Sequence, residues 1–446
     1  MALQTPLSFT VRACGAAALL ALITACGGGS GSGASGVPLG PIAAPDSPAA
    51  TPAPRLPAIF QPAEAVLGQA NLEVGEVNRG QDLAGPQTLH LPVGMALTPA
   101  GGLLVVDAGN SRVLLFPSVP ATMGPDAEGV LGQPDLHTGG PSLAQGGLNL
   151  PFGVAVGAGR MAVADAEAHR VLIYAEVPAL GRPMPQPVAA IGQPDFETGV
   201  PDCSRAGLAF PSSVAITPEG KLIVADSWNH RVLVWGAMPA RQEDVLPPSL
   251  VLGQRLLNSC IRNDDDESGE EDFDSRTGLS RASARTLRFP SGVWSDGDRL
   301  VVADTANHRV LIWKHFPQDD FQEADIVLGH PGFTETTPNN QQVPMTAGTL
   351  FGPQDVDADG TSLAVVDTAN NRVLIWKSFP EHDFQPADIV LGHDGFGQRV
   401  VDDQDGDGWP DAPTARILNR PLKVLFTPDA LLVSDSFHHR VLMFRR

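Results

Sequence analysis

A motif that recurs six times constrains the fold of this chain more than any other feature. Each copy has an apolar run that ends in Asp, a short turn, and then Arg-Val-Leu followed two residues later by an aromatic residue. The copies end at Phe116, Tyr174, Trp235, Trp313, Trp376 and Phe444. Self-similarity at a period of tens of residues is typical of solenoids and propellers, in which each repeat buries its apolar surface against its neighbours. We therefore expect a fold built from six equivalent units.

Each unit contains four segments with β-strand character. A run that starts with Pro, such as residues 92–96, comes first, then the run ending in Asp, the Arg-Val-Leu run and a Val-Leu-Gly-Gln-like run. Runs of β-branched and apolar residues between turn-forming residues favour strands. The two central runs are apolar on both faces, as expected for a sheet packed between two others. The 47 Gly and 41 Pro suit many short strands joined by turns. The sequence predicts an all-β, six-bladed β-propeller of four-stranded blades.

The order of the Val-Leu-Gly-Gln-like runs predicts how the ring closes. The first of them, residues 66–69, precedes every blade, and none follows the last blade. The N-terminal strand should therefore complete blade six, which removes the exposed sheet edges that an open ring would carry. We expect the propeller to occupy residues 61–446.

The repeat resembles the NHL repeat, over about residues 91–446. Residues 226–231 (Asp-Ser-Trp-Asn-His-Arg) and 304–309 (Asp-Thr-Ala-Asn-His-Arg) are similar to the Asp-Thr-Gly-Asn-His-Arg string of that family, whereas residues 165–170 (Asp-Ala-Glu-Ala-His-Arg) depart from it. The resemblance implies an NHL-type propeller. One NHL enzyme, the peptidyl-hydroxyglycine amidating lyase, holds zinc through histidines just after the Pro of the innermost strand. The equivalent residues here are not zinc ligands: Val93, Phe152, Ser212, Ser291, Gln354 and Leu422. The resemblance to the lyase therefore ends at the fold.

Six Asp residues each precede an Arg by five positions, across the predicted turn. A carboxylate and a guanidinium can meet there through charge-assisted hydrogen bonds. Because a catalytic group is needed once and not six times, we interpret the pairs as structural. They are Asp107 and Arg112, Asp165 and Arg170, Asp226 and Arg231, Asp304 and Arg309, Asp367 and Arg372, and Asp435 and Arg440.

Histidines of these turns invite a metal hypothesis, which the geometry of a propeller opposes. His169, His230, His308 and His439 belong to four different blades. Zinc needs its ligand atoms about 2.1 Å from one centre, and equivalent positions on neighbouring blades are farther apart than that allows. We expect packed or surface histidines.

A calcium hypothesis arises in the loop that leads into the last blade. Asp403, Asp405, Asp407 and Asp411 occupy alternate or nearby positions, with Gly408 among them, and resemble the start of a calcium loop, although the twelfth position is Thr414 and not Glu. The alternative is a solvated acidic turn. Asp355, Asp357 and Asp359 show a similar pattern, but they align with the innermost strand of blade five, and strand alternation accounts for it.

Cys203 and Cys260 are the only cysteines expected in the mature propeller. Both fall in loops that join an outer strand to the inner strand of the next blade, so these loops share one face. In an oxidising compartment an interblade disulfide is expected, with two free thiols as the alternative.

The N-terminal residues indicate export. Arg12 precedes an apolar run, residues 13–23, that is too short to span a bilayer. Residues 23–26 (Ile-Thr-Ala-Cys) resemble a bacterial lipobox, which implies a signal peptide at 1–25 and lipidation of Cys26. The alternative is an ordinary secretory signal. Residues 26–60 are rich in Gly, Ser, Pro and Ala and are expected to be a flexible tether. Gly27 resembles the residue that sends lipoproteins to the outer membrane.

These observations favour a cell-envelope propeller over an enzyme, and they single out no catalytic residue. We expect a monomer that holds a protein, peptide or glycan partner on its loop-bearing face and contacts the membrane only through its lipid anchor. A net charge of −21 argues against nucleic acid, which basic faces bind, including those of TRIM-type NHL propellers. The alternative is a metal-dependent lyase or hydrolase with a site on the propeller axis, and a third interpretation is a propeller stabilised by structural calcium.

Overall fold

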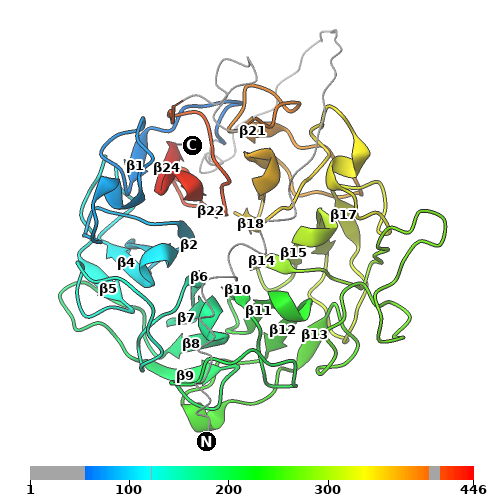
Figure 1. The fold of residues 1–446 in the computed structure, drawn as a ribbon, viewed down its shortest axis with the longest axis horizontal. Coiled ribbons are helices and arrows are strands. Elements are labelled where there is room, and N and C mark those ends of the chain that lie inside the picture. The colour runs from blue at the N-terminus through cyan, green and yellow to red at the C-terminus, as the bar shows by residue number, and fades with distance from the viewer. Residues whose placement is uncertain (1–55, 122, 401–411, 446) are drawn as a thin grey trace, which may run out of the picture.

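The computed structural model describes residues 56–121, 123–400 and 412–445, and within them it shows six antiparallel four-stranded sheets arranged around an axis (Figure 1). In each sheet the strands follow one another from the axis outward, and the innermost strands surround the centre of the ring. The predicted six-bladed β-propeller is therefore confirmed. No helix of the described residues is long and apolar enough to cross a membrane.

The first three blades have regular four-strand order. Blade one contains β2 (Pro92–Leu97), β3 (Leu103–Asp107), β4 (Arg112–Phe116) and β5 (Gly129–Leu131). Blade two contains β6 (Pro151–Gly157), β7 (Arg160–Asp165), β8 (Arg170–Tyr174) and β9 (Pro187–Ile191). Blade three contains β10 (Pro211–Ile216), β11 (Leu222–Asp226), β12 (Arg231–Trp235) and β13 (Leu250–Leu252).

The last three blades include the one that closes the ring. Blade four contains β14 (Pro290–Ser295), β15 (Leu300–Asp304), β16 (Arg309–Trp313) and β17 (Ile326–Leu328). Blade five contains β18 (Asp355–Ala358), β19 (Leu363–Asp367), β20 (Arg372–Trp376) and β21 (Ile389–Leu391). Blade six contains β22 (Lys423–Phe426), β23 (Ala430–Asp435), β24 (Arg440–Arg445) and, from the N-terminal end, β1 (Ala65–Leu67).

Short 3-10 helices form the turns and parts of the loops. Six of them join the second and third strands of the blades: η2 (Ala108–Asn110), η3 (Ala166–Ala168), η4 (Ser227–Asn229), η6 (Thr305–Asn307), η8 (Thr368–Asn370) and η9 (Ser436–His438). The others lie in longer connections: η1 (Val77–Gly80), η5 (Gln242–Asp244) and η7 (Pro338–Gln341).

The ring closes as the sequence predicts, with β1 as the outermost strand of blade six. It pairs antiparallel with β24, so that Val66 lies opposite Leu442, and Figure 1 shows β1 beside β24. The segment that precedes β1 makes a further link, because Phe60 donates its backbone N–H to the carbonyl of Val390 in blade five at 3.0 Å. The two ends of the described chain are thus held in one sheet.

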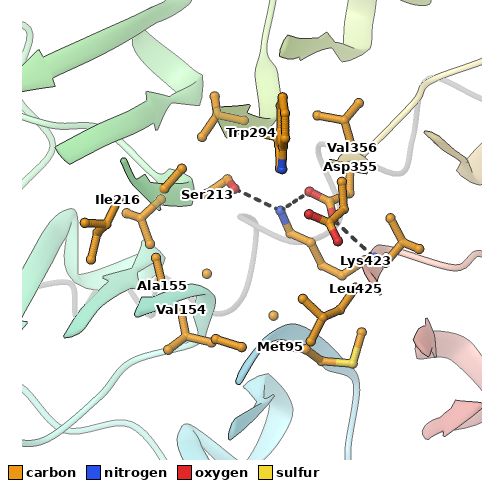
Figure 2. Close-up of a pocket in the computed structure, with 18 of the residues that line it drawn as sticks. Met95, Val154, Ala155, Ser213, Ile216, Trp294, Asp355, Val356, Lys423 and Leu425 are labelled. Atoms are coloured by element: carbon orange, nitrogen blue, oxygen red, sulfur yellow. Dashed lines mark hydrogen bonds and ion pairs between the residues drawn. The ribbon is translucent and has the colours of Figure 1, made fainter. Parts of the chain in front are cut away.

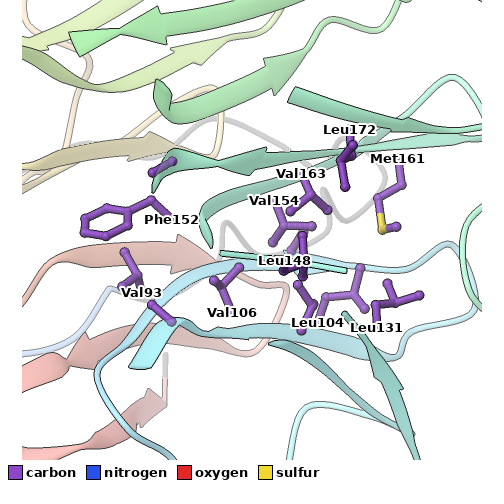
Figure 3. Packing of buried hydrophobic residues seen from close by; sticks show 14 of the residues in the cluster. Val93, Leu104, Val106, Leu131, Leu148, Phe152, Val154, Met161, Val163 and Leu172 are labelled. Atoms are coloured by element: carbon purple, nitrogen blue, oxygen red, sulfur yellow. The ribbon is translucent and has the colours of Figure 1, made fainter. Parts of the chain in front are cut away.

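The apolar core consists of six clusters, each between two neighbouring blades. In the cluster between blades one and two, Leu104 and Val106 of β3 face Val154 and Val163 of blade two (Figure 3). The cluster between blades six and one includes Leu67 of the closing strand. Because every blade has such a cluster on each side, its central strands have to be apolar on both faces, as their sequences are.

A hydrogen bond between neighbouring blades also recurs around the ring. The residue just before the repeated Arg has a left-handed backbone, and its side chain accepts a backbone N–H from the start of the next innermost strand. His230, for example, accepts from Phe289 through Nδ1 at 3.2 Å and packs edge-on against its ring. The equivalent acceptors are Ser111, His169, His308, Asn371 and His439. The turn histidines thus hold blades together.

These contacts predict an acid-sensitive element of stability. Burial, followed by the charges of Arg262 and Arg288, lowers the pKa of His230 to about 3, from an ordinary value of 6.5. Between these values the unfolded chain binds a proton that the folded chain does not, so stability falls as the pH falls from 6.5 towards 3. We expect the wild type to lose stability relative to His230→Asn by up to about 1.4 kcal/mol per pH unit in this window.

Denaturant unfolding of the two proteins at pH 4, 5, 6 and 8 measures this difference. Asn is the matched replacement, because Asn371 makes the same contact in blade five through its side-chain oxygen at 2.9 Å. Parallel stability profiles for the two proteins across this range would contradict the role assigned to His230.

Candidate functional site

The long loops of the propeller lie on one face. They run from the outermost strand of a blade to the innermost strand of the next, and we call this side the loop face. Its loops comprise residues 68–91, 132–150, 192–210, 253–289, 329–354 and the described parts of 392–422.

The six Asp–Arg pairs anchor these loops as well as the turns. In blade four, Arg309 Nε donates to Asp304 Oδ2 at 2.7 Å, and its Nη2 donates to the carbonyls of Ser283 and Thr286 at 2.9 Å each. The other carboxylate oxygen, Oδ1, accepts the backbone N–H of Arg288 at 2.7 Å. All six pairs have Nε to Oδ2 distances of 2.7 or 2.8 Å, and their side chains are fully buried. Each pair therefore fixes the loop that enters its blade.

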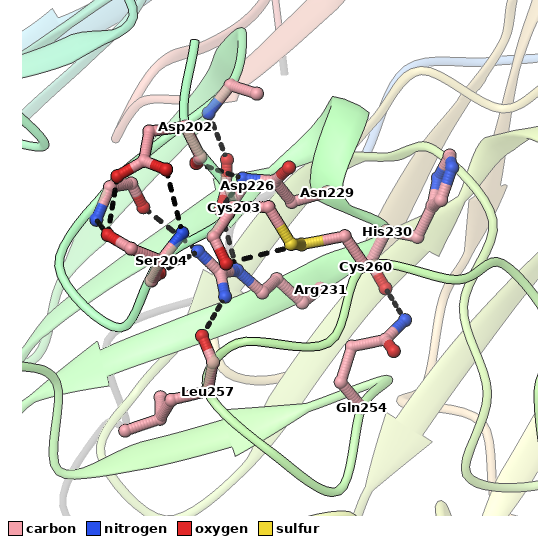
Figure 4. Close-up of polar contacts among 12 residues, drawn as sticks. Asp202, Cys203, Ser204, Asp226, Asn229, His230, Arg231, Gln254, Leu257 and Cys260 are labelled. Carbon is pink, nitrogen blue, oxygen red and sulfur yellow. Dashed lines mark hydrogen bonds and ion pairs between the residues drawn. A yellow bond between two sulfur atoms is a disulfide. The ribbon is translucent and has the colours of Figure 1, made fainter. Parts of the chain in front are cut away.

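A disulfide joins two of the loops. Cys203 of the 192–210 loop and Cys260 of the 253–289 loop are bonded through their sulfur atoms, with their Cα atoms 6.2 Å apart (Figure 4). Arg231 lies beside them and donates to the carbonyl of Ser204 at 3.1 Å. The loops between blades two and three and between blades three and four are thus covalently linked.

The loop face is hollowed where the 253–289 loop meets the 329–354 loop. The hollow has a volume of about 560 Å³. A short antiparallel bridge between Phe273 and Ser280 shapes one wall, and Thr336 of the other loop donates to the carbonyl of Ser280 at 2.7 Å. The side chains of Phe273 and Leu279 line the hollow, although these residues are 58% and 45% exposed. Arg276 and Arg281 line it as well.

Exposed apolar side chains concentrate on this face. Among the described residues, most of the large hydrophobic side chains that remain exposed belong to its loops. They are Val77, Leu83, Leu143, Val200, Leu256, Phe273, Leu279 and Val343.

A second cavity, of about 320 Å³, lies on the axis between the innermost strands of all six blades (Figure 2). Most of its lining is apolar, and Met95, Val154 and Leu425 contribute to it. Its polar side chains come mainly from blades three, five and six. We call it the axial cavity.

Lys423 of β22 crosses the axial cavity. Its Nζ donates to Asp355 Oδ1 of the neighbouring β18 at 2.8 Å and to Ser213 Oγ of β10 at 3.1 Å. Blades six and three lie on opposite sides of the ring, so this side chain spans the axis (Figure 2). Lys423 and Asp355 are buried and form an ion pair.

Asp357 follows Asp355 on the same face of β18. Its Oδ2 accepts the backbone N–H of Phe426 at 2.6 Å, just as Asp355 Oδ2 accepts that of Val424 at 3.1 Å. Burial, together with the negative charges of Asp355 and Asp359, raises the pKa of Asp357 to about 8. At neutral pH this carboxyl group is therefore largely protonated.

Sequence reasoning missed this charged group, although a signal was present. The third residue of the innermost strand run, counted from its Pro, is small in four blades and charged in two neighbouring ones. In blade four a Cβ on Gly292 would lie 2.6 Å from the Cα of Asp355, so this position abuts the next inner strand. The six residues are Gly94, Gly153, Ser213, Gly292, Asp355 and Lys423. A comparison of equivalent positions in the six blades would have identified Asp355 and Lys423.

The other predicted site residues have different outcomes. The calcium candidates Asp403, Asp405, Asp407 and Asp411 lie outside the described residues, as does Cys26. Within the described ranges no group of three or more His, Cys, Asp or Glu residues could hold a metal ion. The turn histidines His169, His230, His308 and His439 are not brought together, since each contacts the next blade along the ring.

Comparisons with known proteins bear on the fold. The NHL repeat model matches residues 208–235, which include β10, β11 and β12 of blade three. No curated protein matches the chain. One similar solved structure is that of a nidogen/laminin complex, at 13% identity and a TM-score of 0.33, covering 66% of this chain and 78% of that one. A similarity at this level says nothing about a partner of this chain.

Proposed function

We propose that this NHL-type propeller is a binding protein that holds a protein or peptide partner on its loop face. The observation that carries the proposal is the hollow between the 253–289 and 329–354 loops, with the exposed Phe273 and Leu279 beside Arg276 and Arg281. Aromatic and Arg side chains are enriched among the residues that dominate protein interfaces.

The way the loops are held supports the same proposal. Loops that are already fixed lose less conformational entropy when they bind, so more of the contact energy remains as affinity. Here the loops that form the hollow are tied by buried Arg309 and Arg372, and the disulfide ties the first of them to the preceding loop. The rigid ring thus presents variable loops, an arrangement in which binding residues commonly occur.

We also propose that the propeller is a cell-envelope lipoprotein, lipidated at Cys26 after removal of residues 1–25 and tethered by residues 26–60, at the outer membrane. The lipobox-like residues 23–26 and the Gly- and Pro-rich composition that follows support this. The mass of the mature N-terminal peptide, with or without a diacylglyceryl group on Cys26, tests it.

The sequence also raised a metal-dependent lyase or hydrolase on the axis. We do not propose it as a second function. The ionisable side chains that line the axial cavity in the described structure are Lys423, Asp355 and Asp357, and the first two already pair with each other.

Site-specific photo-cross-linking in cells of the source organism tests the partner proposal. A photoreactive residue at Phe273 should give a defined protein adduct, whereas one at Leu246 should not. Leu246 is the matched control, because it is apolar, is 71% exposed and lies between β12 and β13, outside the loop face. With the partner purified, Phe273→Ser combined with Leu279→Ser should weaken affinity at least tenfold, and Leu246→Ser should leave it unchanged.

Equal adducts from both positions would contradict a loop-face site. If Phe273 gave no protein adduct and the purified propeller bound oligosaccharides instead, the partner class would be wrong and a glycan would replace it.

A further inference from the structure

The axial cavity contains an uneven set of charges. Two carboxyl groups, Asp355 and Asp357, share it with a single ammonium group, Lys423, which pairs with Asp355. Asp357 forms no ion pair within the described residues, although it lines the cavity. Asp357 is half-buried, and its protonated form is neutral, so a cation that enters the cavity can pair with its carboxylate by replacing that proton.

A free hydrogen-bond donor also borders the cavity. Trp294 of β14 lines it, and Figure 2 shows the indole nitrogen directed towards Lys423 and Asp355. The indole nitrogens of Trp235, Trp313 and Trp376 donate to backbone carbonyls, but that of Trp294 has no acceptor among the described residues. An oxygen atom of a ligand could accept this N–H.

We propose that the axial cavity binds a small organic cation, a primary ammonium compound with a hydroxyl or carbonyl oxygen, whose charge is met by Asp357 and whose oxygen is met by Trp294. This site is separate from the loop face and does not depend on the function proposed there. A volume of about 320 Å³ is at the lower end of the ~300–1,000 Å³ range of ligand pockets, which suits a small molecule.

The shape of the cavity would allow such a ligand to enter from the face opposite the long loops. One end of its lining is at the level of Lys423, which crosses the axis near the start of the innermost strands. The other end is at the far ends of these strands, where Leu97 of β2 and Ile216 of β10 are half-buried. These strand ends lie on the face opposite the long loops. The net charge of −21 attracts cations towards the molecule as a whole.

The charges around Asp357 determine how binding should depend on pH. On its own strand and turn are Asp355 and Asp359, which both raise its pKa, and β22 contributes Lys423, already paired. The turn after β14 contributes Arg299, which pairs with Asp296 at 2.6 Å and donates to the carbonyl of Gly360 at 3.0 Å.

A cation that pairs with the Asp357 carboxylate must displace the proton that the group holds below pH 8. Affinity should therefore rise with pH, by at most about tenfold per unit, until the pH passes about 8, because alkylammonium groups keep their own proton up to about pH 10.

Isothermal titration calorimetry of the full-length protein with three matched three-carbon probes tests the proposal. We expect 3-amino-1-propanol, as its cation, to bind at least tenfold more tightly than 1,3-propanediol or 3-hydroxypropionate, and to bind more tightly at pH 8 than at pH 6. Asp357→Asn should abolish both the preference for the cation and its pH dependence. Asp298→Asn should change neither, because Asp298 is an exposed carboxylate in the turn after β14.

Each other outcome overturns the proposal. The proposal is wrong if the three probes bind equally or if none of them binds. It is also wrong if 3-hydroxypropionate binds most tightly, because that result would show an anion site around Lys423. If Asp357→Asn does not fold, the probe series on the wild-type protein decides alone. An alkylammonium group can also arrive as a lysine side chain, and acetyl-Gly-Lys-Gly-amide, titrated beside 3-amino-1-propanol, distinguishes a peptide from a free amine.

Discussion

A chain that begins at residue 71, and so lacks residues 1–70, should have a free energy of unfolding lower by more than about 5 kcal/mol and should melt at a markedly lower temperature. The deletion removes β1, whose Ala65, Val66 and Leu67 are at most 2% exposed. Burial of each large apolar side chain contributes about 1.5–3 kcal/mol, and each backbone hydrogen bond to β24 contributes about 0.5–1.5 kcal/mol. Since a folded domain is stable by only about 5–15 kcal/mol, most of the margin depends on this strand.

Thermal unfolding followed by circular dichroism measures the effect, and removal of residues 1–55 alone is the control. That shorter deletion keeps β1 and should leave the melting temperature unchanged. If the chain that begins at residue 71 unfolded as cooperatively and at the same temperature as the control, the closing strand would not stabilise the ring.

Substitution of Arg309 by Leu should cost about 3–5 kcal/mol of stability. The change removes the donor to Asp304 and the donors to the carbonyls of Ser283 and Thr286, and it leaves Asp304 fully buried without its cationic partner. Breaking a buried ion pair from one side is strongly destabilising because the remaining charge is uncompensated. Urea unfolding with the m-value compared between variants measures the loss.

Arg285→Leu is the matched control for this substitution. Arg285 lies in the 253–289 loop that Arg309 anchors, and it pairs with Glu323 at 2.6 Å, but the two side chains are 39% and 60% exposed. An exposed pair of this kind contributes about 0–1 kcal/mol. Equal losses in the two variants would show that burial of the Asp304–Arg309 pair is not what makes it important.

The roles of repeated residues could be predicted only in part. The spacing of Asp304 and Arg309 predicts that they meet across a turn, because both belong to one hairpin. It does not predict that the same guanidinium holds two carbonyls of the preceding loop, since loop paths are not encoded in a short pattern. Likewise, His230 and Asn371 occupy equivalent positions in their blades, and both side chains contain a hydrogen-bond acceptor. That shared acceptor was the signal in the sequence that both would accept a backbone N–H from the next blade.

The axial cavity shows where sequence reasoning stopped short. The alternation of Asp355 and Asp357 correctly indicates a strand, and β18 confirms it. The sequence of this strand alone, however, does not explain why carboxylates occupy these positions. The reason lies in Lys423, which is 68 residues from Asp355 and also donates to Ser213, 210 residues from Lys423. No local pattern connects either residue to β18.

The sequence by itself determined the number of blades, the four strands of each and the closing role of β1, because each of these depends on patterns that repeat along the chain. Only the tertiary structure decided which side chains meet across the axis and which loops enclose the hollow beside Phe273. Those contacts depend on how six blades pack around a common centre, and packing brings together residues that are distant in sequence and differ from blade to blade.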